Sequence, residues 1–144
     1  MKQLIAVIAA AGFLFAFIPV DNATTNEAEI NDSVTVTGTL VDSKCYGEMP
    51  SMNKGNEHVV MKDGQQMKMP NCATACANMG IPAAIATADG KTVTVIAPAG
   101  QLAEHMEKEI RVQGRMAYDG GLIPDKVEVR DGRRWKEVAI AFMM

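Results

Sequence analysis

The alternation of apolar and polar residues along the chain predicts a mainly β protein. Residues 33–41 read SVTVTGTLV, in which valine and threonine alternate as in a strand that is buried on one side. Asp-Gly pairs at 63–64, 89–90 and 131–132 are typical of tight turns between neighbouring strands. Residues 100–109 instead carry apolar side chains at the spacing of a short amphipathic helix, with Leu102 and Met106 on the face expected to enter the core. Apolar runs predict two further strands before this helix, on either side of the turn at 89–90, and two after it, beginning near residues 110 and 126.

The order of these elements, three strands, a helix and then two strands, is that of an OB-fold barrel. In that fold the helix bridges the third and fourth strands, which is where residues 100–109 fall. We therefore expect residues 33–144 to form a single domain, a five-strand OB-fold-like barrel. An insert at 42–82 follows the first strand and carries all three cysteines of the chain. Long loops in small domains are usually functional, so we expect the chemistry to lie in this insert.

The N-terminus has the layout of a secretory signal. Lys2 precedes an apolar run from residue 4 to residue 20, and a polar stretch follows at once. Cleavage after Ala23 gives a signal peptide of residues 1–23 and a polar linker of residues 24–32. The run at 4–20 is also almost long enough to stay in the membrane as an uncleaved anchor. Both alternatives predict an exported protein of the periplasm or cell envelope, whose contact with the membrane is limited to this segment.

Charge and composition argue against several classes of function. The formal net charge is −3 and aromatic residues make up 5% of the chain, so a nucleic-acid partner is not expected. No stretch resembles a Ser-His-Asp set, a phosphate-binding loop or a pair of catalytic carboxylates. These features favour a binding protein over an enzyme. Outside the cytosol, cysteines tend to form disulfides or to bind a ligand. The chain has three, and this odd number means that they cannot all pair within the chain.

Cys72 and Cys76 are predicted to share one face of a short helix. Asn71 is a suitable N-cap for it, and Gly80 followed by Pro82 is a suitable stop. Residues four apart on a helix have Cβ atoms about 5–6 Å apart, whereas a disulfide needs roughly 3.5–4.5 Å. The pair therefore suits the binding of one ion better than a mutual disulfide.

A third cysteine and several further donors are expected at the same point. Cys45 ends the first strand, and both ends of the insert return to one region of the barrel, which brings Cys45 to the helix pair. The fourth ligand is Met69, Met79 or His58. Thiolate and thioether ligands favour Cu(I), whereas three cysteines with one histidine suit zinc, so copper is the first choice and zinc the second. Six of the 11 methionines fall in the insert, beside polar neighbours: Met49, Met52, Met61, Met67, Met69 and Met79.

Three stretches of the chain follow a shared pattern: GTLVDSKCYGEM, CATACANMGIPAAIATADGK and KEIRVQGRMA. In this order they resemble a group of small exported bacterial domains with an OB-fold-like barrel. In that group a His-x2-Cys-Ala-x2-Cys motif precedes Gly-Ile-Pro. The present chain has Met69 at the position of the histidine, and its nearest histidine is His58. The resemblance implies the fold and the place of the site, and no settled activity.

Three functions are consistent with these features. The first is an exported binding protein for one soft metal ion, preferably Cu(I), which handles copper in the envelope or delivers it to an envelope or respiratory protein. The second is a thiol–disulfide redox protein that uses the same cysteines. The third is a structural or interaction module whose insert is stapled by one disulfide. The sequence favours the first.

Overall fold

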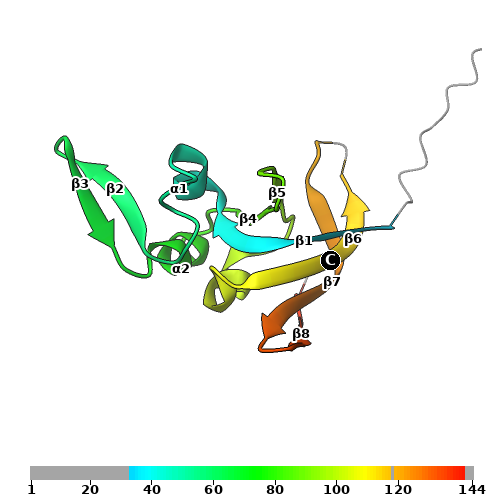
Figure 1. Ribbon diagram of the computed structural model, residues 1–144. Coiled ribbons are helices and arrows are strands. Elements are labelled where there is room, and N and C mark those ends of the chain that lie inside the picture. Colours follow the sequence, from blue (N-terminus) through cyan, green and yellow to red (C-terminus); the bar gives the residue numbers. More distant parts are fainter. Residues whose placement is uncertain (1–32, 118, 142–144) are drawn as a thin grey trace, which may run out of the picture.

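The computed structural model describes residues 33–117 and 119–141, and the predicted signal, anchor and linker at residues 1–32 lie outside this part. Six strands form one antiparallel sheet: β1 (Ser33–Asp42), β4 (Ala83–Ala86), β5 (Thr92–Thr94), β6 (Glu109–Met116), β7 (Leu122–Asp131) and β8 (Arg134–Val138). Their order across the sheet is β5-β4-β1-β6-β7-β8 (Figure 1). Among the described residues, none of the helices has the length and apolar character needed to span a bilayer.

The predicted mainly β fold is confirmed, but the sheet differs from the predicted five-strand barrel. A sixth strand arises because the turn at Gly132 folds Arg134–Val138 back onto β7. Within residues 33–117 and 119–141 the sheet does not close into a barrel. One isolated parallel bridge, between Val95 and Leu122, joins the chain after β5 to the start of β7. A single bridge ties these two segments together without continuing the sheet.

Strand β1 lies inside the sheet and delivers the chain to the insert. Its first part pairs with β6, and its last part, from Thr39 to Asp42, pairs with β4. Gly38 lets β4 come close at this changeover, since a Cβ atom on Gly38 would collide with the carbonyl oxygen of Ala86. The last three residues of β1 are fully buried, so the strand ends with the Asp42 carboxyl group inside the protein.

A short 3-10 helix, η1 (Ala99–His105), stands where the sequence predicts a helix at 100–109. Its Leu102 and the following Met106 enter the core, as predicted. The helix ends early because Glu107 has a left-handed backbone (φ 68°), after which β6 begins. The largest fully buried side chains of the main core are aliphatic: Leu40, Ile85, Val95, Leu102, Ile110, Val112, Leu122 and Val127.

The insert at 42–82 folds into two short helices and a hairpin: α1 (Ser43–Glu48), β2 (His58–Lys62), β3 (Gln65–Met69) and α2 (Cys72–Asn78). The hairpin stands at one end of the molecule, with the two helices between it and the main sheet (Figure 1). Helix α2 packs against η1 and β1, and its Ala73 and Ala77 belong to the main core. The core therefore fixes the position of α2, and α2 holds the insert against the main sheet.

Candidate metal centre

Cys45 is held by a helix that the sequence did not lead us to expect. It lies within α1 rather than at the end of β1. The side chain of Asp42 caps this helix, because its Oδ1 accepts a hydrogen bond from the backbone N–H of Cys45 at 2.9 Å. Both side chains are buried, so the capping carboxylate and the cysteine enter the same interior space.

Helix α2 carries Cys72 and Cys76 as predicted, and both side chains are buried. Asn71 is at the N-cap position as predicted, but its side chain does not cap the helix. Asn71 has a left-handed backbone (φ 56°), and its side chain makes no capping hydrogen bond. Asn56 supplies the cap from the preceding loop, since its Oδ1 accepts a hydrogen bond from the N–H of Thr74 at 2.9 Å.

The hairpin supplies a buried imidazole. The predicted turn at Asp63 and Gly64 is confirmed, and β3 returns alongside β2 so that Met69 lies directly opposite His58. His58 is fully buried, and its Nε2 lies 3.0 Å from the carbonyl oxygen of Gly55. Because a carbonyl oxygen only accepts, Nε2 carries the proton, and Nδ1 of the neutral ring keeps its lone pair. This is the usual way in which a protein orients a histidine toward a metal ion.

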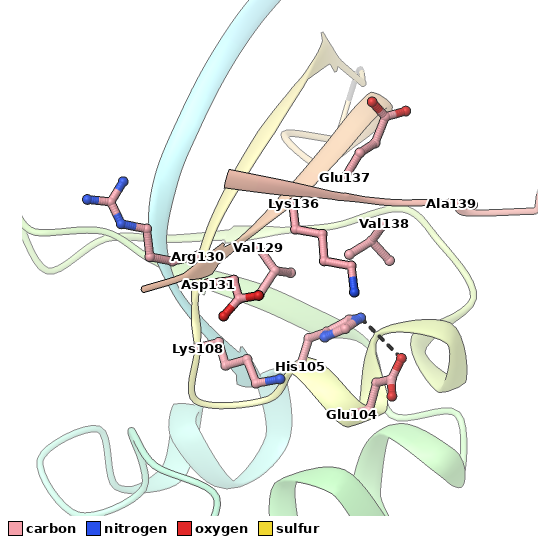
Figure 2. Close-up of a pocket in the computed structure, with 10 residues that line it drawn as sticks. All are labelled: Glu104, His105, Lys108, Val129, Arg130, Asp131, Lys136, Glu137, Val138 and Ala139. Atoms are coloured by element: carbon pink, nitrogen blue, oxygen red, sulfur yellow. Dashed lines mark ion pairs between the residues drawn. The ribbon is translucent and has the colours of Figure 1, made fainter. Parts of the chain in front are cut away.

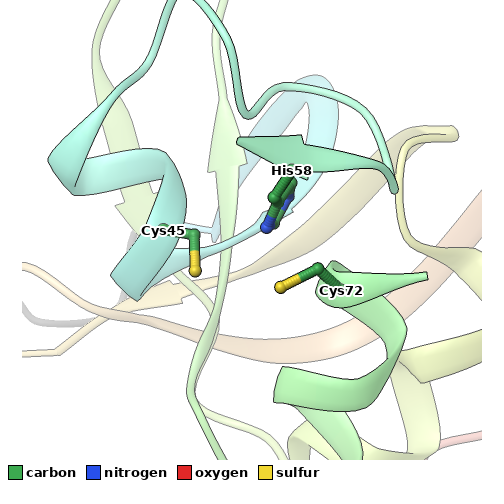
Figure 3. A group of neighbouring side chains, drawn as sticks. All are labelled: Cys45, His58 and Cys72. Carbon is green, nitrogen blue, oxygen red and sulfur yellow. The ribbon is translucent and has the colours of Figure 1, made fainter. Parts of the chain in front are cut away.

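The three elements bring their donor atoms to one buried point, where Figure 3 shows Cys45, His58 and Cys72 pointing toward one another. The donor atoms of these three residues lie within 4.8 Å of one another. A second group, Asp42, Cys45 and Cys76, meets the same limit. Two sulfur ligands, each about 2.3 Å from one metal ion, are at most about 4.6 Å apart. The spacing within each group is therefore close to that of ligands of a single ion, and Cys45 belongs to both groups. All three thiols are free to bind an ion.

Two facing acceptor atoms add to the case for a cation. Nδ1 of His58 lies 3.3 Å from Oδ2 of Asp42, and both side chains are fully buried. Within the described part of the chain, neither of these atoms has a hydrogen-bond partner. Two buried acceptors at this distance repel each other unless a proton or a metal ion lies with them. The pair therefore favours the uptake of a positive charge.

In the metal-free protein the surroundings hold two of the thiols in their neutral form. Burial raises the pKa of Cys45 to about 12, with contributions from the carboxylate of Asp42 and from the other two cysteines. Burial and Asp42 likewise raise the pKa of Cys76. Such thiols are poor nucleophiles, because the thiolate is the reactive form. A bound cation stabilises the thiolate and so makes ligands of the same groups.

Two asparagines, which the sequence analysis missed, hold the three elements together. Asn53 donates a hydrogen bond to the carbonyl oxygen of Cys45 and accepts one from the N–H of Val59, both at 2.8 Å, which ties α1 to β2. The cap that Asn56 gives to Thr74 ties the start of β2 to α2. Asparagines in a polar loop have no characteristic spacing, so only the three-dimensional structure identifies their role.

Five of the six methionines of the insert are exposed, and Met49 is half-buried. Met69 and Met79, which the sequence analysis names as ligands, are exposed by 43% and 74%. Their part in metal binding stays a prediction, whereas His58 lies among the buried donors. In the described residues, five of the six exposed large apolar side chains are methionines of the insert: Met52, Met61, Met67, Met69 and Met79.

A separate cavity of about 450 Å³ lies between η1 and the strands β7 and β8 (Figure 2). One ion pair within it joins Nε2 of His105 to Glu104 at 3.4 Å. Positive and negative side chains both line this cavity, and none of the lining residues is a cysteine: Glu104, His105, Lys108, Val129, Arg130, Asp131, Lys136, Glu137, Val138 and Ala139. The mixed charges favour no single class of ligand, so the cysteine cluster is the stronger candidate site.

Comparison of the chain with family models, curated proteins and solved structures gives no match. The resemblance to exported OB-fold-like domains therefore stays a prediction. The assignment of function rests on the geometry of the site.

Proposed function

We propose that this protein binds one soft metal ion, Cu(I), through Cys45, Cys72, Cys76 and His58. The observation that carries the proposal is the convergence of three buried thiols and one buried imidazole from α1, β2 and α2. Sulfur donors are soft and favour Cu(I). The hydrogen bond on Nε2 of His58 leaves Nδ1 as the fourth donor.

The exposed methionines favour copper over zinc. Thioether sulfur is a ligand for Cu(I), and zinc sites use thiolate, imidazole and carboxylate instead. The five exposed methionines of the insert do not fill the hydrophobic core, which is the usual role of methionine. The binding of Cu(I) by thioether sulfur accounts for their presence at the surface. Zinc remains the second candidate, because three cysteines and one histidine form a known type of closed structural zinc site.

The N-terminal sequence supports a role in the cell envelope. Residues 1–23 have the layout of a secretory signal, and residues 4–20 are the alternative anchor. Free thiols outside the cytosol tend to oxidise, and a bound ion would protect them. We therefore propose that the protein handles Cu(I) in the envelope or delivers it to an envelope or respiratory protein. Mass spectrometry of the protein recovered from the envelope will show whether it begins after Ala23.

Anaerobic titration of the full chain with Cu(I) tests the proposal. We expect one ion per chain and protection of all three thiols against a thiol reagent. His58→Gln is expected to weaken Cu(I) binding by roughly 10-fold or more. The matched control, His105→Gln, changes the other histidine of the chain and is expected to bind as the unmodified protein does.

The other outcomes identify the competing functions. Uptake of Zn(II) with no uptake of Cu(I) assigns a zinc site. A disulfide that forms and breaks reversibly, with no metal uptake, assigns the thiol–disulfide redox protein. The raised pKa of Cys45 argues against that second function, because exchange needs a thiolate. A disulfide that only a strong reductant breaks assigns a stapled structural module.

A further inference from the structure

The hairpin β2–β3 has two faces, which its register defines. Met69 pairs with His58, and Met67 pairs with Val60. Residues directly opposite on antiparallel strands share one face, with Cβ atoms about 4.5–5.5 Å apart. Met61 pairs with Gln66 one position away and therefore lies on the other face.

The face that carries Met67 and Met69 is the one turned toward the metal centre. His58 donates one of the clustered ligand atoms. Val60 packs against the cluster of three cysteines. The two methionines are therefore neighbours of residues that touch the site, yet they are exposed by 40% and 43%. They are thus exposed to solvent and lie next to residues that contact the buried cluster.

We propose that Met67 and Met69 capture Cu(I) at the surface and pass it to the buried cysteines. This inference rests on the proposed function, because it needs Cu(I) as the ion. A thioether is neutral and has no proton to lose, so it binds Cu(I) without any change of protonation. All three cysteines are buried, so an ion that arrives from solvent meets the exposed methionines first.

The transfer is a ligand exchange in which copper keeps its oxidation state. A bond between copper and a thioether breaks as a bond between copper and a cysteine sulfur forms. Each thiol that becomes a ligand releases its proton to water. No electron moves, so no oxidant or reductant is needed. The methionines end the exchange free and take no part in the final set of ligands.

The kinetics of Cu(I) transfer from a soluble chromophoric chelator to the full chain test this inference. The double variant Met67→Leu/Met69→Leu keeps the volume and apolar character of both side chains. We expect its loading rate to fall by about tenfold or more, with an unchanged equilibrium affinity. Met61→Leu changes the opposite face of the same hairpin and is the matched control, with an expected loading rate equal to that of the unmodified protein.

Each outcome decides between the two proposals. Equal loading rates for the double variant and the control overturn capture by Met67 and Met69, while Cu(I) binding itself still stands. A fall in equilibrium affinity as large as the fall in rate also overturns it, because the methionines would then be permanent ligands. Failure of the unmodified protein to take up any Cu(I) overturns the proposed function, and the inference with it.

Discussion

Nδ1 of His58 and Oδ2 of Asp42 face each other at 3.3 Å in the interior of the protein. Each side chain is fixed by its other polar atom, since Asp42 caps α1 through Oδ1 and His58 contacts the carbonyl oxygen of Gly55 through Nε2. Neither side chain can turn away without losing that contact. When His58 is neutral, the metal-free site holds two buried acceptors together, and a proton or a metal ion relieves their repulsion.

Asp42→Asn tests this relationship. Asparagine is as good an N-cap as aspartate, and its amide can donate to Nδ1 of His58 in place of the repulsive oxygen. We expect the metal-free protein to gain on the order of 1 kcal/mol in its free energy of unfolding. We also expect Cu(I) affinity to fall by roughly 10-fold, because Nδ1 must leave the amide before it binds the ion. Urea unfolding and competitive Cu(I) titration measure the two effects.

Asp63→Asn is the control for the loss of charge. Asp63 lies at the exposed tip of the hairpin and has a left-handed backbone (φ 49°), which asparagine also tolerates. We expect no change in either measurement. If Asp42→Asn lowers the stability of the metal-free protein, Asp42 is paired with a protonated His58 and the interpretation of the two facing acceptors is wrong.

Asn53→Ala is expected to loosen the site. Asn53 is fully buried and bonds to the carbonyl oxygen of Cys45 and to the N–H and carbonyl groups of Val59. The substitution removes these bonds, although the carbonyl oxygen of Cys45 keeps the one from the N–H of Met49. Each unpaired buried group costs roughly 1–3 kcal/mol, so we expect a total loss of about 3 kcal/mol. Cu(I) affinity should fall too, because α1 and β2 are no longer tied together. The exposed Asn78 gives the control Asn78→Ala, with an expected change within about 0.5 kcal/mol.

Gly38→Ala and Gly47→Ala are expected to have opposite effects on stability. The new Cβ at Gly38 meets the carbonyl group of Ala86 on β4, and we expect a loss of about 1–3 kcal/mol. Gly47 lies in α1 with nothing within 4 Å of the added atom, and alanine there should stabilise the helix by about 0.5–1 kcal/mol. Urea unfolding followed by the fluorescence of Trp135, the one tryptophan of the chain, measures both. Equal effects of the two substitutions would contradict the close approach of β4 at Gly38.

The pH dependence of stability should reflect His105. Burial lowers the pKa of His105, Glu104 opposes this, and Lys108 and Lys136 lower it further. The unfolded chain therefore binds the proton more readily, so the contribution of His105 to stability falls as the pH drops below about 6.5. Urea unfolding at several pH values between about 5 and 7.5 should give a shallower pH dependence for His105→Gln. His58 is present in both proteins, so the difference between them isolates His105, and identical slopes would refute this assignment.

Local chemistry accounts for the elements that the sequence predicted well. The Val-Thr alternation of β1, the Asp63-Gly64 turn and the Ala-rich stretch of α2 each depend on neighbours in the chain. The periodicity of side chains and the backbone freedom of glycine act within a few residues, so both are visible in the sequence. The sequence does not predict the sixth strand, β8, although it directly follows the predicted Asp131-Gly132 turn, because its mostly polar residues show no apolar alternation.

The candidate site likewise combines features that the sequence determines with features that only the tertiary structure decides. The sequence by itself determined which soft donors are present, three cysteines and six methionines of the insert, and that two of the cysteines share a short helix. Only the tertiary structure decided that His58 is buried beside Cys45 and Cys72. It also decided that Met69, at the position where the resembled pattern has a histidine, lies across the hairpin from that imidazole. The physical reason is that strand register and buried hydrogen bonds join residues distant in the chain, and no local pattern records which of them will meet.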